Sequence, residues 1–425
     1  MHIGVLGAGA LGLTVAYRLA QRGHRVTVIE KEPLPGGLAS GFRLGDTYLE
    51  KFYHHLFRSD REIVQLIHEL GLGSDLVWRR PQTSTLYGGR IYPLDSPLHV
   101  LRFSPLPFLD RLRLGLAVAY LKIERNYHRF AGQTAASWIA RWMGPRAYAV
   151  VWQPLLVAKF GEYYDKIAMP WFWARVHLRS ATLGYLRGGF QRLYDRLAAA
   201  VVAHGGAVRL EETVTAISSQ PDGRVRVETT QGEAEFDRLV VTLPTRLFLR
   251  LARGLPADYI ARYDRGLAYG AHCVVLVLDR PLTSVYWLNI NDPGYPFLAL
   301  VEHTNFMSPA DYGGRHIVYL SNYLPMDHPL FRLSDGEVLE RFLPALARIN
   351  PAFRPAWVRE AYVFKAPYAQ PIVTVDFPTI IAPHRTPLPH VYLANMFQIY
   401  PQDRGQNYSV RLANQMARLV AAESA

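Results

Sequence analysis

Apolar and polar residues in the first thirty positions follow a pattern that predicts a strand, a helix and a second strand. His2–Leu6 and Arg25–Glu30 are short apolar runs typical of buried strands, whereas Leu13–Arg22 has helical spacing. The glycine-rich stretch Gly7–Gly12 stands between the first strand and the helix. This order predicts the opening unit of a parallel α/β sheet, with a tight turn at the glycines.

The rest of the chain divides into stretches of different pattern. Residues 98–180 have helical spacing and many aromatic residues, which predicts a helical insertion. Residues 268–325 alternate between apolar and polar positions, which predicts a mixed sheet with its own core. The pattern also predicts helices over Asp60–Leu70, Phe190–His204, Asp335–Ile349 and from Val410 onward, a hairpin over Thr85–Pro93, and strands at Ala207–Leu210, Val225–Thr230, Leu239–Leu243 and Val391–Ala394.

The composition and net charge of the chain indicate which classes of molecule it can bind. The 425 residues are 50% hydrophobic and 19% charged, as in a folded globular protein. The formal charge of +12 favours anionic partners such as phosphates, nucleotide-linked substrates or an anionic membrane surface. Nucleic acid is not expected as a partner, because the chain has no recognisable nucleic-acid-binding motif.

Cysteine content and apolar runs bear on the cellular location. Cys273 is the single cysteine, so an intrachain disulfide is excluded and no metal site is expected. We interpret Cys273 as a small core residue in an apolar strand. A reducing cytoplasm fits this composition best. We expect no secretion signal, because the N-terminus runs straight into the first strand without a charged leader and an apolar segment. We expect no membrane span, because no apolar run reaches about 18 residues.

The glycine turn has the residue types that a dinucleotide needs. Gly7 allows a sharp turn, Gly9 lets backbone amides approach a pyrophosphate, and Gly12 lets the helix pack closely on the strand. Glu30 ends the second strand, where an acid accepts hydrogen bonds from an adenosine ribose. Glycine turns alone are common, but here strand, helix, second strand and acid are in register. We therefore predict a Rossmann-like dinucleotide-binding domain.

The order of the pieces resembles the flavoprotein superfamily of amine oxidases, protoporphyrinogen oxidases and phytoene desaturases, which includes UDP-galactopyranose mutase. The first glycine motif and its acid resemble the family's ADP-binding element for FAD, Gly36-Gly37 resembles its second glycine element, and Leu186–Phe190 resembles its Gly-Gly step before a helix. Val214 falls where the family contacts adenine, and Leu393–Asn395 resembles the segment that returns under the flavin ring.

The resemblance implies noncovalent FAD, since the late segment has no cysteine for a thioether link. The implied cofactor-binding residues are Gly7, Gly9, Ala10, Leu11, Gly12, Glu30, Lys31, Gly36, Gly37, Leu38, Val214, Asn395, Asn407 and Tyr408. The implied fold is α/β, a GR2-type flavoprotein with a mixed-sheet substrate domain. We expect a discontinuous FAD-binding domain over 1–90, 185–267 and 386–425, a helical insertion over 91–184 and a substrate-binding sheet domain over 268–385.

Sharper local matches concern the mutase branch. His54–Asp60 resembles the mutase segment beside the flavin, Lys159-Phe160-Gly161 its Lys-Gln-Trp-Gly element, and Arg404–Tyr408 its late Arg-x-x-x-Tyr element. Arg175 and Arg179 resemble its Arg-x-x-x-Arg element and, one helical turn apart, are spaced to present two guanidinium groups to an anion. The implied catalytic residues are His55, Lys159, Arg175, Arg404 and Tyr408.

Departures from the mutase are equally specific. Tyr269-Gly270-Ala271 stands where the mutase has a diphosphate-clamping arginine, and Ala369-Gln370-Pro371 stands where it has Ala-Tyr-Pro. Val410 takes the place of its later tyrosine. We therefore predict an FAD-dependent oxidoreductase that transfers hydride from an unidentified, lipophilic or sugar-linked substrate. The alternatives are a non-redox mutase acting on a nucleotide- or lipid-linked sugar, and a flavin-binding carrier without catalysis.

Residues 103–129 leave open a contact with the membrane. Leu109, Leu112, Leu116, Tyr120 and Ile123 recur at helical spacing among basic residues, a pattern compatible with an interfacial helix. The alternative is a core helix with a basic, solvated face. The Phe103–Phe108 segment favours the membrane, because two prolines make it hard to bury inside a regular helix. Such contact would place a cytoplasmic protein on the inner face of a membrane.

Overall fold

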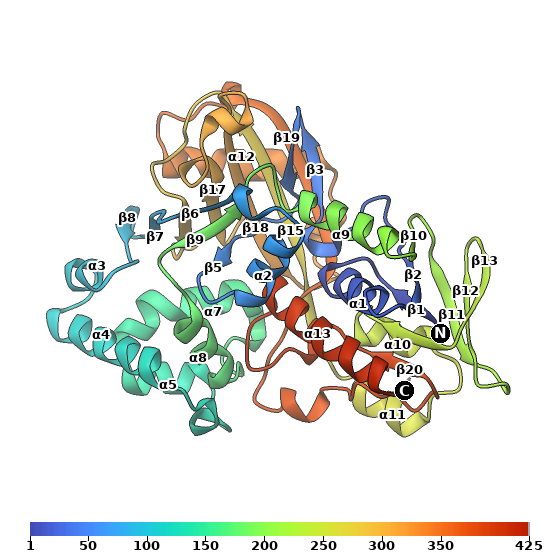
Figure 1. Ribbon diagram of the computed structural model, residues 1–425. Helices are drawn as coiled ribbons and strands as arrows, with labels where there is room; N and C mark the ends of the chain where they lie inside the picture. The colour runs from blue at the N-terminus through green and yellow to red at the C-terminus, as the bar shows by residue number, and fades with distance from the viewer. Residues whose placement is uncertain (424–425) are drawn as a thin grey trace.

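The computed structural model describes residues 1–423 and is built around a five-stranded parallel sheet (Figure 1). The strand order is β10-β2-β1-β14-β20, and every neighbouring pair is parallel. Its strands are β1 (His2–Leu6), β2 (Arg25–Ile29), β10 (Ala207–Arg209), β14 (Arg238–Val241) and β20 (Val391–Leu393). The predicted α/β class is therefore confirmed, with strands from three distant parts of the chain.

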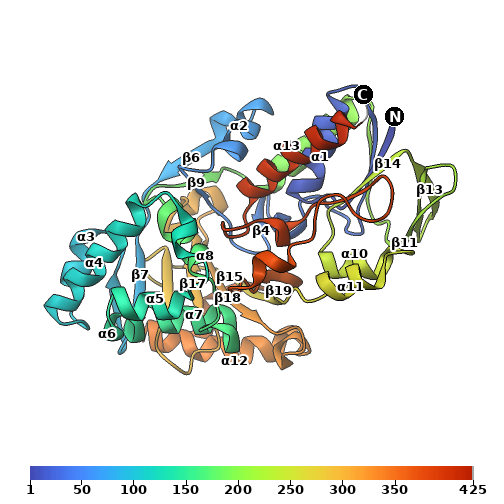
Figure 2. The ribbon, with the colours of Figure 1, turned by 90° about the horizontal axis from the view of Figure 1, so that it is seen from below.

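Helix α1 (Ala10–Ala20) lies between two other helices, α9 (Gln191–Ala203) and α13 (Gln406–Ala422). Both views show α13 running beside α1 (Figure 2). The α1 helix begins three residues before the predicted Leu13, because the chain turns helical directly after the extended residue Gly9. The α13 helix likewise begins at Gln406, before the predicted Val410.

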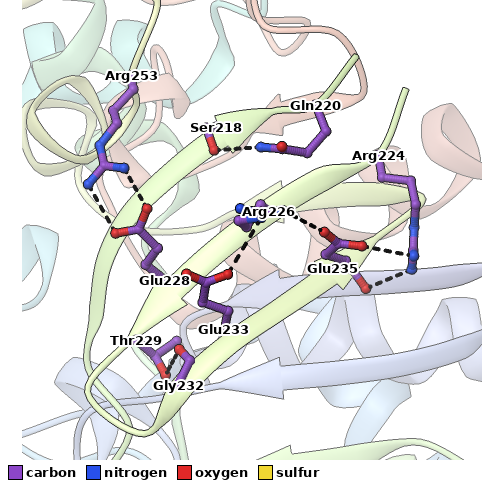
Figure 3. Close-up of polar contacts among 10 residues, drawn as sticks. All are labelled: Ser218, Gln220, Arg224, Arg226, Glu228, Thr229, Gly232, Glu233, Glu235 and Arg253. Carbon is purple, nitrogen blue, oxygen red and sulfur yellow. Dashed lines mark hydrogen bonds and ion pairs between the residues drawn. The ribbon is translucent and has the colours of Figure 1, made fainter. Parts of the chain in front are cut away.

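An antiparallel sheet lies beside the parallel one and consists of β11 (Val214–Ser219), β12 (Val225–Thr229) and β13 (Gly232–Phe236). One face carries cross-strand ion pairs (Figure 3): the Arg226 guanidinium lies 3.2 Å from the Glu235 carboxylate and 3.6 Å from that of Glu233. Arg253, outside the sheet, pairs with Glu228. Such exposed pairs contribute at most about 1 kcal/mol each to stability.

A seven-stranded sheet forms the second large layer, in the order β19-β15-β18-β17-β16-β7-β8. The fully buried Cys273 lies on β15, which confirms its interpretation as a core residue. The hairpin β7–β8 confirms the one predicted at Thr85–Pro93 and pairs with β16, so it belongs to this sheet although we assigned residues up to 90 to the nucleotide part. The strands are β7 (Thr83–Tyr87), β8 (Arg90–Pro93), β15 (Ala268–Leu278), β16 (Trp287–Ile290), β17 (Ala299–Glu302), β18 (His316–Leu324) and β19 (Val358–Pro371), and α12 (Asp335–Ile349) packs near them.

The segment predicted as a helical insertion is helical, and its core also includes Tyr269 on β15 and Ile372, Val373, Phe377 and Phe397 from later in the chain. The segment consists of α3 (Pro97–Arg102), α4 (Phe108–Ile123), α5 (Ala135–Trp142), α6 (Pro145–Ala147), α7 (Gln153–Phe160) and α8 (Met169–Leu178), with a π-helical turn at Tyr148–Trp152. Residues 103–107 lie outside any helix, as their two prolines suggest, but two of their side chains are nonetheless buried. Phe103 and Leu106 are each 1% exposed, because the chain folds back before α4 and places both side chains in the core. No helix among residues 1–423 is long and apolar enough to cross a bilayer.

Smaller elements connect these layers. They are β3 (Gly41–Leu44), β4 (Thr47–Glu50), β5 (Leu56–Phe57), α2 (Arg61–Glu69), β6 (Leu76–Arg79), β9 (Leu183–Leu186), α10 (Thr245–Leu251) and α11 (Ala257–Tyr263). The β3 and β4 strands form a pair, and β5-β9-β6 form a three-stranded sheet.

A buried carboxylate, Glu50 on β4, joins elements of both large layers. Its two oxygens accept hydrogen bonds from the Tyr185 hydroxyl on β9 and from the Phe190 N–H before α9, each at 2.7 Å. The Tyr319 hydroxyl on β18 donates to the Glu50 carbonyl at 3.0 Å. Burial raises the pKa of Glu50 from 4.5 to about 7, although the bonds from Phe190 and Tyr185 oppose the shift.

This raised pKa predicts a pH dependence of stability. Between pH 4.5 and 7 the folded state binds more protons at Glu50 than the unfolded state does, so the free energy of unfolding falls as pH rises through this window. Between pH 5 and 8, the free energy of unfolding of the wild-type protein should fall by about 3 kcal/mol more than that of Glu50→Gln. Urea unfolding at both pH values measures the difference. The exposed control Glu233→Gln keeps Glu50 and should lose stability with pH as the wild-type protein does. An equal pH trend in Glu50→Gln and Glu233→Gln would contradict the assignment to Glu50.

Candidate functional site

The glycine turn between β1 and α1 brings two stretches of backbone unusually close. Gly7 has a φ of +102°, a conformation that side chains disfavour, and its N–H donates to the Ile29 carbonyl at 2.8 Å. A Cβ on Gly12 would lie 1.9 Å from the Gly7 carbonyl oxygen. Only glycine therefore lets α1 dock on the end of β1.

The second glycine element contacts the first. Gly36 and Gly9 form a parallel bridge, and the Gly36 N–H donates to the Ala8 carbonyl at 2.8 Å. A Cβ on Gly37 would lie 3.2 Å from the Gly9 Cα, so a larger residue would push the two loops apart. The loops that the sequence identified separately thus form one structure.

The N-terminus of α1 has the features of an anion site. Among the described residues, no side chain caps this end and its first turn contains no acid, so the amides of its first turn and the helix dipole face an anion unopposed. A Cβ on Gly9 would meet only the Gly37 Cα, at 4.0 Å, which shows open space beside the backbone. A pyrophosphate fits this donor set, with Ala10, Leu11 and Gly12 in the first turn.

Glu30 follows β2 and lies next to this turn. One carboxylate oxygen accepts from the Ala8 N–H at 2.7 Å and the other from the Glu32 N–H at 3.0 Å. These bonds hold the carboxylate beside the glycine loop. Each oxygen keeps a further lone pair, which a ribose hydroxyl can use as an acceptor.

The other residues predicted to bind the cofactor lie in different surroundings. Val214 starts β11, Leu38 is half-buried behind the second glycine loop, and Lys31 is exposed and pairs with Glu32. Asn395 caps a turn after β20, and the Asn407 side chain accepts from the N–H groups of Glu62 and Ile63 at the start of α2. Both asparagine side chains are thus used by the protein, and their cofactor contact stays a prediction.

A second site gathers cations around one carboxylate. The Asp403 cluster consists of Lys159 on α7, Trp171 and Arg175 on α8, Tyr323 on β18, and Asp403 and Arg404 before α13. Asp403 accepts from Lys159 Nζ at 3.3 Å, from Trp171 Nε1 at 3.2 Å and from Arg175 Nη1. Arg404 Nη2 donates to the Tyr323 hydroxyl at 2.6 Å. Three of the predicted catalytic residues therefore lie together.

Charge dominates this cluster. Burial alone would raise the pKa of the Asp403 carboxyl, but Lys159, Arg175 and Arg404 together lower it well below its usual range. Burial and the nearby Arg175 hold the pKa of Lys159 well below its usual value, although Asp403 opposes the shift. One carboxylate thus faces an excess of basic groups, an arrangement that attracts an anionic ligand.

His55 lies apart from the Asp403 cluster, in an aromatic setting. Its Nδ1 is 3.0 Å from the Tyr286 hydroxyl, and its ring contacts Phe57 and Trp287. Burial, followed by the charges of Arg179 and His54, lowers the pKa of His55 to about 3. The imidazole is therefore neutral at pH 7, with one ring nitrogen as a hydrogen-bond donor and the other as an acceptor.

Arg179 and Tyr408, which the sequence analysis also singled out, lie in other surroundings. Arg179 lies past the end of α8 with extended backbone, so it does not share a helical face with Arg175 as the spacing suggested. Tyr408 is half-buried in α13 under the Arg411 guanidinium, and burial raises its pKa to about 12.

Asp403 and Tyr323 were missed by the sequence analysis. Asp403 is 228 residues from Arg175 and 244 from Lys159, so no local spacing connects them. The one available signal was its position directly before the Arg404 motif.

The family model described as "Flavin containing amine oxidoreductase" matches residues 12–401. The chain belongs to this family. The predicted relationship is confirmed, and the chain is a flavoprotein of an oxidoreductase family with the predicted fold class.

Several curated relatives are carotenoid enzymes, and others are D-amino acid dehydrogenases that match over short segments. The 15-cis-phytoene desaturase of Narcissus pseudonarcissus is 23% identical over 386 residues, which are 83% of this chain and 66% of that protein. The zeta-carotene desaturase of Zea mays is 28% identical over 138 residues, which are 29% of this chain and 24% of that protein. The chain thus spans less than two thirds of the length of these relatives.

Solved structures share the whole fold. A putative protoporphyrinogen oxidase from Exiguobacterium sp. 255-15 has a TM-score of 0.78 and 20% identity, covering 99% of both chains. Reduced UDP-galactopyranose mutase has a TM-score of 0.77 and 15% identity, covering 98% of this chain and 96% of that one. At these identities the likeness concerns the fold alone.

The Asp403 cluster generates a stability prediction. Asp403→Asn leaves the half-buried cations without their counter-charge and should lower the free energy of unfolding by roughly 3 kcal/mol at pH 7. Because the pKa of Asp403 is lowered on folding, its contribution is present above about pH 3.8 and lost as pH falls below it. Urea unfolding at pH 7 and pH 3 measures both effects. The matched control Glu228→Gln, which breaks an exposed pair with Arg253, should cost less than about 1 kcal/mol. Equal costs would contradict the cluster's electrostatic role.

Proposed function

We propose that this protein is an FAD-dependent oxidoreductase that oxidises a small-molecule substrate by hydride transfer to the flavin. The observation that carries this proposal is the uncapped N-terminus of α1, held open between two glycine loops beside Glu30. FAD, when bound, supplies the hydride acceptor, while the protein orients the substrate and excludes water.

The cofactor-binding residues in this proposal are those of the glycine loops, Glu30, Lys31, Val214 and the late segment with Asn395, Asn407 and Tyr408. FAD is held without a covalent bond, because the single cysteine is buried in β15, far along the chain from the late segment. Only one dinucleotide fingerprint is present in the sequence. The reduced flavin therefore passes its electrons to an acceptor other than a nicotinamide cofactor bound in a second nucleotide-binding domain.

The substrate pocket in this proposal lies between the helical insertion and the seven-stranded sheet. Lys159, Arg175 and Arg404 hold an anionic group of the substrate, supported by their convergence on Asp403. His55 borders the pocket as a neutral hydrogen-bonding group, supported by its low pKa and its bond with Tyr286. Tyr408 completes the predicted set.

A non-redox sugar mutase is the second candidate, favoured by the cationic Asp403 cluster. One observation weighs against it. Gly270 occupies the position of the mutase's clamping arginine, and a Cβ there would lie 2.6 Å from Phe331 Cζ and 3.0 Å from the Ala366 carbonyl oxygen. The packing of β15 thus leaves no room for a side chain at this position.

Partners and location complete the proposal. The substrate is a lipid-linked, nucleotide-linked or other small molecule, and the enzyme works in the cytoplasm. Peripheral contact with the inner face of a membrane through residues 103–129 is part of the proposal, supported by the exposed side chains of α4.

The direct experiment is anaerobic mixing of the holoenzyme with candidate amines, carotenoid precursors and sugar nucleotides. An oxidised substrate should bleach the visible flavin band, and oxygen or a quinone should restore it. Sugar isomerisation by the pre-reduced enzyme, without net flavin oxidation, would favour the mutase. Binding of a candidate substrate without either reaction would instead indicate a flavin-binding carrier.

Noncovalent FAD predicts a clean release of cofactor. Acid denaturation should leave FAD in the supernatant, and Gly9→Val should yield folded protein with little flavin, because the side chain fills the space open to the pyrophosphate. Absorbance of the supernatant and circular dichroism of the protein measure both. Gly336→Val, at an exposed position in the first turn of α12 with open space around it, is the control and should keep its flavin. Flavin that stays with the denatured chain would contradict this prediction.

Arg175→Lys tests the substrate pocket. A lysine keeps the charge but loses the planar fork of donors, so the apparent KM should rise about tenfold or more while flavin content stays unchanged. Steady-state kinetics and the ratio of flavin to protein absorbance measure the two effects. The control Arg253→Lys, which changes the exposed pair with Glu228, should change neither. An unchanged KM would remove Arg175 from the pocket.

A further inference from the structure

Exposed apolar side chains are concentrated on one part of the molecule. Fifteen large apolar residues are exposed among the described residues, and nine of them lie between positions 98 and 142. We call these nine the α3–α4 face: Leu98, Leu101, Phe108, Leu109, Leu112, Leu116, Tyr120, Ile123 and Trp142. Both views place α3 and α4 at the edge of the molecule, remote from the parallel sheet (Figures 1 and 2).

Helix α4 has two apolar stripes rather than one. Leu114, Ala117 and Leu121 are buried and hold the helix against the insertion. Leu109, Leu116 and Ile123 recur seven residues apart on a different face and are 75%, 72% and 75% exposed. A core helix needs only the first stripe, so the second has no partner within the described chain.

The charge around this face is strongly positive. Residues 97–146 contain eight arginines and lysines but only two acids, Asp110 and Glu124. Arg102, Arg125 and Arg146 are exposed. Arg113 donates to the carbonyls of Arg141 and Trp142 and so holds the exposed Trp142 beside α4. Half of the chain's net charge of +12 thus lies in this segment.

We infer that the α3–α4 face docks on an anionic lipid bilayer. Leucines, a phenylalanine and a tryptophan insert at the level of the headgroups, and the surrounding arginines contact the phosphates. A protein partner would need an apolar surface with an acidic rim, whereas a bilayer offers both features at any point of its surface. This inference rests on the membrane contact included in the proposed function, and it adds the class of lipid and the side chains that bind it. It is independent of the redox step.

The docking face is directly connected to the candidate substrate site. Lys122 Nζ on α4 donates to the Arg179 carbonyl at 2.6 Å, and Trp173 Nε1 on α8 donates to the Glu124 carbonyl at 2.8 Å. The same α8 carries Arg175 of the Asp403 cluster. A single helix therefore separates the bilayer from the cationic site, which suits a substrate with a lipophilic body and an anionic head.

Flotation of the holoenzyme with vesicles tests the inference. At low salt the protein should float with vesicles of equal parts phosphatidylcholine and phosphatidylglycerol, and much less with phosphatidylcholine alone. High salt should weaken the binding, because it screens the arginines. The triple variant Leu109→Ser, Leu116→Ser, Ile123→Ser should bind at least about tenfold less, since it removes inserted apolar surface.

Matched variants make the result specific. Val202→Ser, Leu267→Ser and Met326→Ser together replace three exposed apolar residues elsewhere and should leave binding unchanged. Arg125→Gln with Arg146→Gln should weaken binding to anionic vesicles only. Flavin content and circular dichroism show that each variant is folded. The inference is overturned if the wild-type protein does not float with the vesicles, or if the triple variant floats equally well. It is also overturned if the wild-type protein forms a dimer that does not bind lipid and the triple variant is a monomer.

Discussion

The close approach of α1 to the end of β1 is the constraint on which this structure depends. Gly12 lies against the Gly7 carbonyl at a distance that no side chain permits, and Gly37 lies so close to Gly9 that a side chain there would force the loops to shift. This packing leaves the first-turn amides of α1 facing open space. The same feature thus sets the docking of the helix on the sheet and creates the place for an anionic cofactor.

The Asp403 cluster differs from this site in the kind of group that attracts an anion. The glycine loops attract an anion with backbone dipoles and have no charged side chain among their donors, whereas the cluster uses full charges and keeps one carboxylate as an internal counter-ion. Backbone donors suit a permanently bound group, and mobile side chains suit a ligand that must come and go. The division fits a protein with one resident cofactor and one exchanging substrate.

Local patterns were sufficient to predict the parts whose contacts are local. The β1–α1–β2 unit, the hairpin at β7–β8 and the helix at Asp335–Ile349 follow from spacing and turn residues within a few tens of positions. The Asp403 cluster was not predictable in the same way, since its members come from α7, α8, β18 and the loop before α13. Phe103 and Leu106 show a further limit, because burial outside regular helices depends on how the chain folds back.

The parallel sheet has a consequence for how the chain acquires its structure. Strand β1 pairs with β14, more than 230 residues later, and β14 pairs in turn with β20 near the C-terminus. Arg18 on α1 and Arg22 in the turn that follows it bond to Asn414 and Ala417 on α13. During synthesis the apolar faces of β1 and α1 therefore emerge long before their partners exist. The parallel sheet can be completed only after β20 and α13 have also been synthesised, so its folding depends on contacts between segments that leave the ribosome at very different times.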